Sequence, residues 1–169
     1  MNGIPEGTKD GGTEAQAKEL CLRLLTDRAR SRAELAGKLA AKGFSDSVAE
    51  AALNRLTEVG LIDDEAFAQQ WVRSRHEHAG KGRHALAREL HRKGIAKDVA
   101  DTALTEITAG DEHERAAELV RKKLRTMHIG DDPADRDRAL RRLVGMLARR
   151  GYSQGTAYSV AKAELLNDP

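Results

Sequence analysis

Apolar residues recur at intervals of three and four through most of the chain, beginning near Ala15. Residues with this spacing share one face of a helix, so each run predicts an amphipathic helix. Ser31 and Glu34 have the spacing of a capping box that opens a helix, and Gly43 is placed to end it. Ser45 can cap the next helix, which Gly60 ends. The stripes of these first three helices contain Leu20, Cys21, Leu24 and Leu25, then Leu35 and Leu39, then Val48, Ala52, Leu53 and Leu56.

The same order of signals returns twice further along the chain. Asp63 or Asp64 can cap a helix, and Gly94 ends the helix after it. Asp132 as cap and Pro133 at the first helical position then open a long helix. The apolar positions of these later helices are Phe67, Trp71, Leu86, Leu90, Val99, Ala103, Leu104 and Ile107, followed by Leu119, Val120, Leu124, Leu140, Leu143, Val144 and Leu147.

One sequence pattern occurs three times, which indicates a tandem repeat. Residues 32–44 read RAELAGKLAAKGF and residues 83–95 read RHALARELHRKGI, with Arg, two Leu, Lys, Gly and an apolar residue in register. Residues 140–152, LRRLVGMLARRGY, keep the leucines, a basic residue and the glycine. The offset is 51 residues between the first two copies and 57 between the last two. The six extra residues match the length of a loop at 128–133.

These patterns predict an all-α protein made of three three-helix repeats, about nine helices in all, with helix-turn-helix-like units. We expect the repeats at residues 14–60, 61–110 and 111–169, after a disordered tail at 1–13 that has no apolar period. A unit of about 45 residues buries little surface alone, so the units should stack into an elongated array. Such an array suits an extended partner.

Composition excludes several classes of protein. The 29 Lys and Arg nearly balance the 27 Asp and Glu, so the formal net charge of +2 does not by itself indicate a nucleic-acid partner. One cysteine excludes an internal disulfide. No apolar run approaches the ~20 residues of a membrane span, and the first residues lack the apolar block of a signal peptide. We therefore expect a cytoplasmic protein with no membrane partner.

Two stretches carry a strong resemblance to the RecX family of recombination regulators. GLIDDEAFAQQWVRSR at 60–75 is a Gly-apolar-apolar-Asp-Asp turn that leads into a helix with Phe67, Trp71 and Arg75. GKGRHALARELHRKGI at 80–95 has a basic, glycine-containing turn, a helix with Glu-Leu, and a Lys-Gly-apolar end. The resemblance extends from about residue 15 to about residue 166, and it is weakest in the tail and the last helix.

The resemblance implies a non-catalytic regulator without a cofactor. Members of the family are built from tandem three-helix units and bind the filament that the RecA recombinase forms on single-stranded DNA, along its groove. They suppress ATP hydrolysis, strand exchange and the co-protease activity that triggers the SOS response. They also bind single- and double-stranded DNA without sequence preference. We expect a monomer with the same partners.

The candidate binding surface is a local excess of positive charge. Only Glu77 and Glu89 oppose eight basic residues between positions 73 and 97, and such a patch can meet phosphates or acidic side chains. Gly80 and Gly82 would let the backbone approach a partner closely. The eight residues are Arg73, Arg75, Lys81, Arg83, Arg88, Arg92, Lys93 and Lys97. A second, weaker surface, diluted by aspartates, contains Arg121, Lys122, Lys123, Arg141, Arg142, Arg149 and Arg150.

Other readings of the same residues remain open. Three-helix units also occur in helix-turn-helix proteins that act directly on DNA, although the third helices here carry few side chains suited to base edges. A pure protein scaffold is a further alternative. Phe67 and Trp71 could stack on bases, but their spacing favours core packing. Neither a metal site nor a catalytic group is predicted, because the histidines at 76, 78, 84 and 91 lack accompanying ligands and the Asp63–Asp64 pair has the place of a helix cap.

Overall fold

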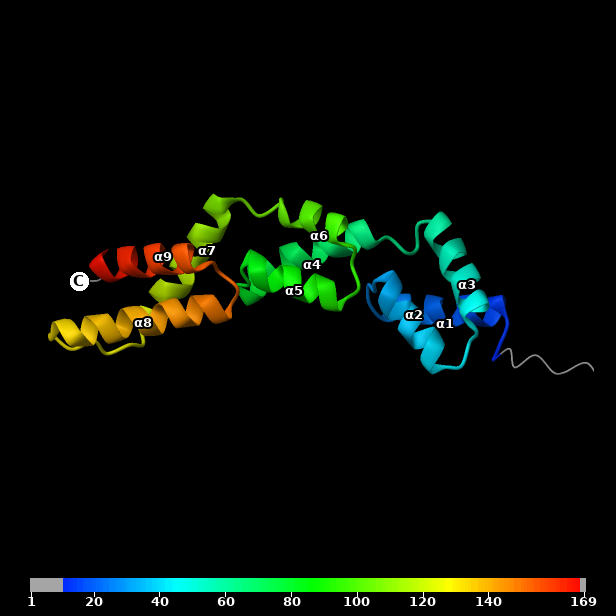
Figure 1. Ribbon diagram of the computed structural model, residues 1–169, viewed down its shortest axis with the longest axis horizontal. Coiled ribbons are helices and arrows are strands. Elements are labelled where there is room, and N and C mark those ends of the chain that lie inside the picture. Colours follow the sequence, from blue (N-terminus) through cyan, green and yellow to red (C-terminus); the bar gives the residue numbers. More distant parts are fainter. Residues whose placement is uncertain (1–10, 168–169) are drawn as a thin grey trace, which may run out of the picture. The chain divides into compact units, whose positions relative to one another are not determined.

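The computed structural model describes residues 11–167, which form nine α-helices and no strand (Figure 1). This confirms the predicted all-α fold with helical repeats. Residues 1–10 of the expected tail lie outside the described range, whereas Thr13 already caps the first helix. The helices are α1 (Glu14–Asp27), α2 (Arg32–Ala41), α3 (Asp46–Glu58), α4 (Asp64–Ala79), α5 (Arg83–Arg92), α6 (Lys97–Leu104), α7 (Ala109–Leu124), α8 (Pro133–Arg149) and α9 (Gln154–Asn167).

The chain divides into two compact units. Unit 1 contains α1, α2, α3, the start of α4 as far as Phe67, and the short segment Lys93–Ile95. Unit 2 contains Ala68–Arg92 and the chain from Ala96 onward. The three repeat boundaries proposed from the sequence stay a prediction.

The helix ends follow the local sequence signals. Ser31 Oγ accepts the Glu34 amide and a Glu34 carboxylate oxygen accepts the Ser31 amide, so the predicted capping box is confirmed. Gly43 ends α2 with φ +86° and Gly60 follows α3 with φ +77°, a region open to glycine at little cost. Asp63 caps α4 through the Ala66 amide at 3.0 Å.

Unit 1 is held together by one apolar core. α1 and α2 both pack on α3, and the side chains between them are almost completely removed from water. Each fully buried leucine contributes about 1.5–3 kcal/mol relative to an exposed one. The thiol of Cys21 lies in this core, where burial raises its pKa, so it remains a neutral apolar group. The core consists of Ala17, Cys21, Leu35, Leu39, Ala52, Leu53, Leu56 and Ile62.

Unit 2 has a core at the end of the chain where α7 and α8 pack on α9, and α8 and α9 lie side by side (Figure 1). Four alanines on α7 and α9 let these helices approach closely. α5 packs on α6 in the same unit. The core around α9 consists of Ala116, Ala117, Val120, Leu124, Ala139, Leu143, Leu147, Tyr152, Ala157, Val160, Ala161 and Leu165.

The glycines that end the second and third copies of the repeated pattern also serve a packing contact. In unit 1, Gly94 lies against Ala33, and Ser31 Oγ donates a hydrogen bond of 2.6 Å to the Lys93 carbonyl. In unit 2, Gly151 lies against Ala85. Each of these contacts joins the first turn of one copy of the pattern to the glycine that ends the next copy.

The expectation that Gly80 and Gly82 face a binding partner is wrong. The Gly82 amide donates to the Arg150 carbonyl at 2.8 Å, and a Cβ on Gly82 would lie 2.6 Å from the Gly151 carbonyl. The Gly80 carbonyl accepts the Tyr152 hydroxyl at 3.0 Å. Both glycines therefore allow close approach within unit 2, and the space next to them is already filled.

The third copy of the pattern differs from the other two in its helix. α8 has 17 residues, whereas α2 and α5 have 10 each. Leu140, which aligns with the first residues of α2 and α5, lies inside α8, so the insertion lengthens this helix as well as the loop at 128–133. Because the amides near Leu140 are bonded within α8, they cannot receive another glycine turn. In the described part of the chain, no helix is long and apolar enough to cross a membrane.

Candidate binding surface

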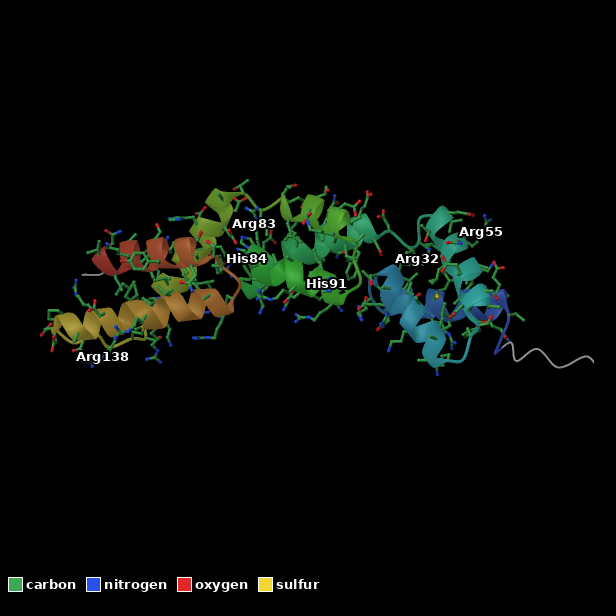
Figure 2. All side chains as sticks on the ribbon, viewed as in Figure 1. Arg32, Arg55, Arg83, His84, His91 and Arg138 are labelled. Carbon is green, nitrogen blue, oxygen red and sulfur yellow. The ribbon has the colours of Figure 1, made fainter. Side chains whose placement is uncertain are left out.

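The outward face of α5 is basic. Ala85, Leu86, Glu89 and Leu90 are buried, which fixes the orientation of the helix. The remaining polar positions therefore point to solvent, and Figure 2 labels three of them, Arg83, His84 and His91. Positions 84, 88, 91 and 92 are spaced by three and four, so they form a continuous stripe on one side of the helix. The α5 basic face, as defined here, consists of Arg83, His84, Arg88, His91 and Arg92, all exposed.

Half of the eight predicted primary residues form no ion pair with a carboxylate of the described chain, although the charge of Lys81 acts on Glu89 from a distance. Lys81 is half-buried beside the start of α5, and the other three residues of this group lie on the α5 basic face. An exposed cation without a partner stays hydrated and can exchange water for a phosphate or carboxylate at small cost. These four residues are Lys81, Arg83, Arg88 and Arg92.

The other four primary residues form ion pairs within the chain. Arg73 pairs with Glu106 at 3.3 Å, and Lys97 pairs with Asp101 one turn along α6 at 2.6 Å. Lys93 contacts Glu34 at 2.7 Å inside unit 1. The pairs of Arg73 and Lys97 are exposed and hold their partners only weakly.

Arg75 belongs to a buried network rather than to the surface. Glu89 is 8% exposed and accepts hydrogen bonds from Arg75 at 3.0 and 3.2 Å and from Trp71 Nε1 at 2.9 Å. The guanidinium also lies over the indole ring, 5.6 Å from its centroid. Burial raises the pKa of Glu89, but the hydrogen bonds from Arg75 and Trp71 outweigh it and the pKa is lowered overall. Trp71 is therefore engaged in the packing of α4 against α5.

Some of the predicted secondary residues form ion pairs or hydrogen bonds within the chain, and others form no ion pair among residues 11–167. Arg121 pairs with Glu164 at 3.1 Å, and Arg150 donates to the Ala79 carbonyl at 2.9 Å. Asp135 pairs with Arg138, and Asp132 caps α8. Five residues have no ion pair within residues 11–167, namely Lys122, Lys123, Arg141, Arg142 and Arg149.

The end of α8 meets the start of α5 within unit 2. The Gly82 amide bonds to Arg150 and the His84 amide bonds to Gly151 at 3.1 Å. Arg150, the residue after α8, therefore lies next to the first turn of α5, whereas the Arg149 guanidinium lies beside Gly145, one turn back along α8. The two predicted basic regions are thus brought together at this junction, although they are 57 residues apart in the repeat.

Sequence reasoning missed the contribution of two histidines. The sequence indicates no role for His84 and His91 beyond a metal site that lacks further ligands, yet they lie in the stripe with Arg88 and Arg92. The helical spacing of 84, 88 and 91 is the signal that could have placed them there. Across the described residues, no group of three His, Cys, Asp or Glu side chains is arranged to hold a metal ion.

Comparison with known proteins identifies the repeats. The model of the first three-helix domain of RecX matches residues 17–56, and the model of the second matches residues 63–104. A regulatory protein RecX from Mycolicibacterium vanbaalenii is 58% identical over 166 residues, which cover 96% of this chain and 88% of the relative. A regulatory protein RecX from Mycobacterium avium is 57% identical and covers 95% of this chain and 91% of its own length.

Solved structures show the same fold. RecX from Lactobacillus salivarius superimposes with a TM-score of 0.79 at 22% identity, over 90% of this chain and 97% of that one. A second crystal structure, of a regulatory protein RecX, gives a TM-score of 0.77 at 27% identity, over 89% of this chain and 73% of that one. The all-helical repeat fold is therefore shared by proteins whose sequences have diverged widely.

Proposed function

The chain belongs to the RecX family of regulatory proteins, and we propose that it regulates a RecA-type recombinase by binding the filament that the recombinase forms on single-stranded DNA. In this proposal it is a monomeric cytoplasmic protein that needs no cofactor and catalyses no reaction. Its occupation of the filament groove inhibits ATP hydrolysis, strand exchange and the co-protease activity of the recombinase.

The unpaired basic surface of α5 is the observation that supports this proposal. Arg83, Arg88 and Arg92 lie along the exposed face of α5, and none of them forms an ion pair with a carboxylate of residues 11–167. An array of free guanidinium groups can contact successive phosphates of a nucleic acid strand, and it releases counterions when it does so. Binding that depends on this surface should therefore weaken steeply as the salt concentration rises.

The proposed inhibition is steric and electrostatic. A helix of 10 residues is about 15 Å long, so α5 can contact several successive backbone phosphates of an extended strand. A protein bound there prevents a second DNA from entering the groove and resists the changes between filament subunits that accompany nucleotide turnover. No chemical step by this chain is required.

The alternative of a sequence-specific helix-turn-helix protein has less support. The third helix of such a unit reads base edges in the major groove with basic and amide side chains. α6 instead presents Asp98 and Asp101 to solvent, and the charge of Lys97 is shared with Asp101. A negative helix surface is repelled by the phosphates on both sides of the groove.

The test is reversal of the α5 charges in a triple variant, Arg83→Glu, Arg88→Glu and Arg92→Glu. We expect this variant to inhibit the recombinase ATPase far less than the wild-type chain does at equal concentration. For a single strand, the slope of log Kobs against log salt should fall by about 2, because three phosphate contacts are lost. Circular dichroism establishes that the variant retains its helices.

A matched control reverses three exposed charges in unit 1, namely Arg23→Glu, Lys38→Glu and Arg55→Glu. This control changes the net charge equally and should leave inhibition near the wild-type level. A neutral variant with alanine at positions 83, 88 and 92 separates loss of attraction from added repulsion. Full inhibition by both folded α5 variants would remove this surface from the proposed interface.

A further inference from the structure

Unit 2 contains an acidic pocket on a side of α4 that the α5 basic face does not use. The pocket has a volume of about 460 Å³ and lies between the second half of α4, the segment before α7 and the first half of α7. Five carboxylates and two guanidinium groups line the pocket. Their net charge is −3, with His76 not counted. The carboxylates belong to Glu77, Glu106, Asp111, Glu114 and Glu118.

Both guanidinium groups in the wall are engaged. Arg115 donates to the carbonyls of His76 and Glu77 at 3.3 and 2.9 Å and pairs with Glu118 at 2.8 Å. Arg73 pairs with Glu106. Glu77 and Glu114, by contrast, are exposed and have no ion pair in the described part of the chain. The pocket therefore keeps unneutralised carboxylates from two different helices, α4 and α7.

His76 adds a hydrogen-bond acceptor to the pocket. Its side chain is only 8% exposed, and its Nδ1 lies 2.8 Å from the Lys81 carbonyl. A carbonyl can only accept, so Nδ1 carries a proton, and Nε2 is an acceptor whenever that is the only proton on the ring. Nε2 has no hydrogen-bond partner among residues 11–167. Every fully buried side-chain nitrogen or oxygen in this range does have a hydrogen-bond partner. Nε2 is therefore open to solvent, and His76 lines this pocket.

The chemistry of the lining selects the kind of occupant. The described residues hold no cluster that could bind a metal ion, which indicates that the carboxylates are too far apart for one small cation. Only Val72 and Ile107 are apolar, whereas pockets for small organic molecules are predominantly apolar. A planar guanidinium carries five donors and can reach separate acceptors at the same time.

We infer that this pocket binds an arginine side chain presented by a protein partner, with the carboxylates of Glu77 and Glu114 and the His76 Nε2 as its acceptors. The inference rests on the proposed function in taking the recombinase as that partner. It assigns contact with protein to the acidic pocket and contact with DNA to the α5 basic face. The two faces then make separate contributions to one complex.

The first experiment probes the pocket without any protein partner. L-argininamide is titrated into the full-length chain labelled with ¹⁵N, and the imidazole signals of His76 are followed. We expect them to shift with argininamide and to remain unchanged with L-citrullinamide, which has a similar shape and the same α-amino group but a neutral ureido group in place of the guanidinium. The shift should be lost in the double variant Glu77→Gln and Glu114→Gln. An absence of any argininamide-specific shift in the wild-type chain would overturn the inference.

The second experiment measures affinity for the recombinase without DNA, and for a single-stranded oligonucleotide without recombinase. The double variant should bind the recombinase about tenfold more weakly, as expected when interfacial ion pairs are lost, and should bind the oligonucleotide at least as tightly as the wild type. Glu19→Gln with Glu65→Gln removes the same charge from exposed positions outside the pocket and should change neither affinity.

The outcomes distinguish this inference from the proposed function. If the wild-type chain binds the recombinase and the double variant binds it equally well, the pocket is not the contact and the inference fails while the proposed function stands. If the wild-type chain does not bind the recombinase or its filament, the proposed function fails. The argininamide titration then decides alone whether the pocket is an arginine site.

Discussion

The substitution Gly151→Ala tests whether the glycine turn is a packing contact or only a helix end. Gly43 and Gly151 occupy the same position of the repeated pattern, with φ +86° and +96°. A Cβ at Gly43 would meet no atom within 4 Å. A Cβ at Gly151 would overlap the Cβ and the backbone nitrogen of Ala85. The two variants therefore share the conformational cost and differ in the overlap.

The expected difference follows from these contacts. Alanine in the left-handed region costs about 1–2 kcal/mol, and the stiffer unfolded chain returns about 0.4–1 kcal/mol, so Gly43→Ala should be nearly neutral to mildly destabilising. In Gly151→Ala, relief of the overlap requires the turn to move. This weakens the hydrogen bonds from the Gly82 and His84 amides, at about 1 kcal/mol each, and adds about 1–3 kcal/mol of overpacking. The excess over Gly43→Ala is about 3–5 kcal/mol.

Native-state hydrogen exchange measures both variants in the unit that each affects. The amide of Leu53 in α3 reports on unit 1, and the amide of Leu147 in α8 reports on unit 2. Gly94→Ala, where the added Cβ would overlap the Cβ of Ala33 but no backbone atom, should lose an amount of stability between those of the other two variants. Equal destabilisation by Gly43→Ala and Gly151→Ala would refute the idea that the glycine is needed for close approach.

Two further predictions concern buried titratable groups of unit 2. Burial raises the pKa of Tyr152 to about 12. The stabilisation that its neutral hydroxyl contributes should therefore be complete below pH 10 and should be lost as the pH rises through 12. In Tyr152→Phe this decline should be smaller, and at neutral pH the variant should lose about 1–3 kcal/mol because the Gly80 carbonyl loses its donor; urea unfolding at several pH values checks both. The pKa of Glu89 is lowered from 4.5, so its stabilisation is present above this value and is lost as the pH falls through the lower folded value. Glu89→Gln should therefore destabilise the chain by about 1–3 kcal/mol at neutral pH, and the gap to the wild type in urea midpoints should narrow in acid.

The helices and their ends were accessible from the sequence because they depend on neighbouring residues. A capping box such as Ser31 with Glu34 acts over three residues, and an apolar stripe needs only the helical period. The Asp132–Pro133 start of α8 was also predicted from adjacent residues. The length of α8 was predicted in the same way, because Gly151 marks its end.

Long-range contacts were not accessible in the same way. Gly82 contacts Arg150, and nothing near residue 82 indicates that its close neighbour lies 68 positions away. The sequence likewise does not distinguish Arg75 from Arg88, because both lie in the same basic stretch. Only the fold shows that Glu89 forms an ion pair with Arg75 and not with Arg88. The pair between Lys97 and Asp101 is an exception, because a spacing of four on a helix already predicts it.

The repeat itself offers an internal comparison that bears on function. The positions that build the core and the turn are alike in all three copies: Leu35, Leu86 and Leu143; Leu39, Leu90 and Leu147; and Gly43, Gly94 and Gly151. The outward positions differ: Gly37 and Ala41 on α2; Arg88 and Arg92 on α5; and Gly145 and Arg149 on α8. Folding of the same helix on α2 requires no charge at these places. Arg88, Arg92 and Arg149 are therefore additional to what the fold needs, which favours a binding role for these residues.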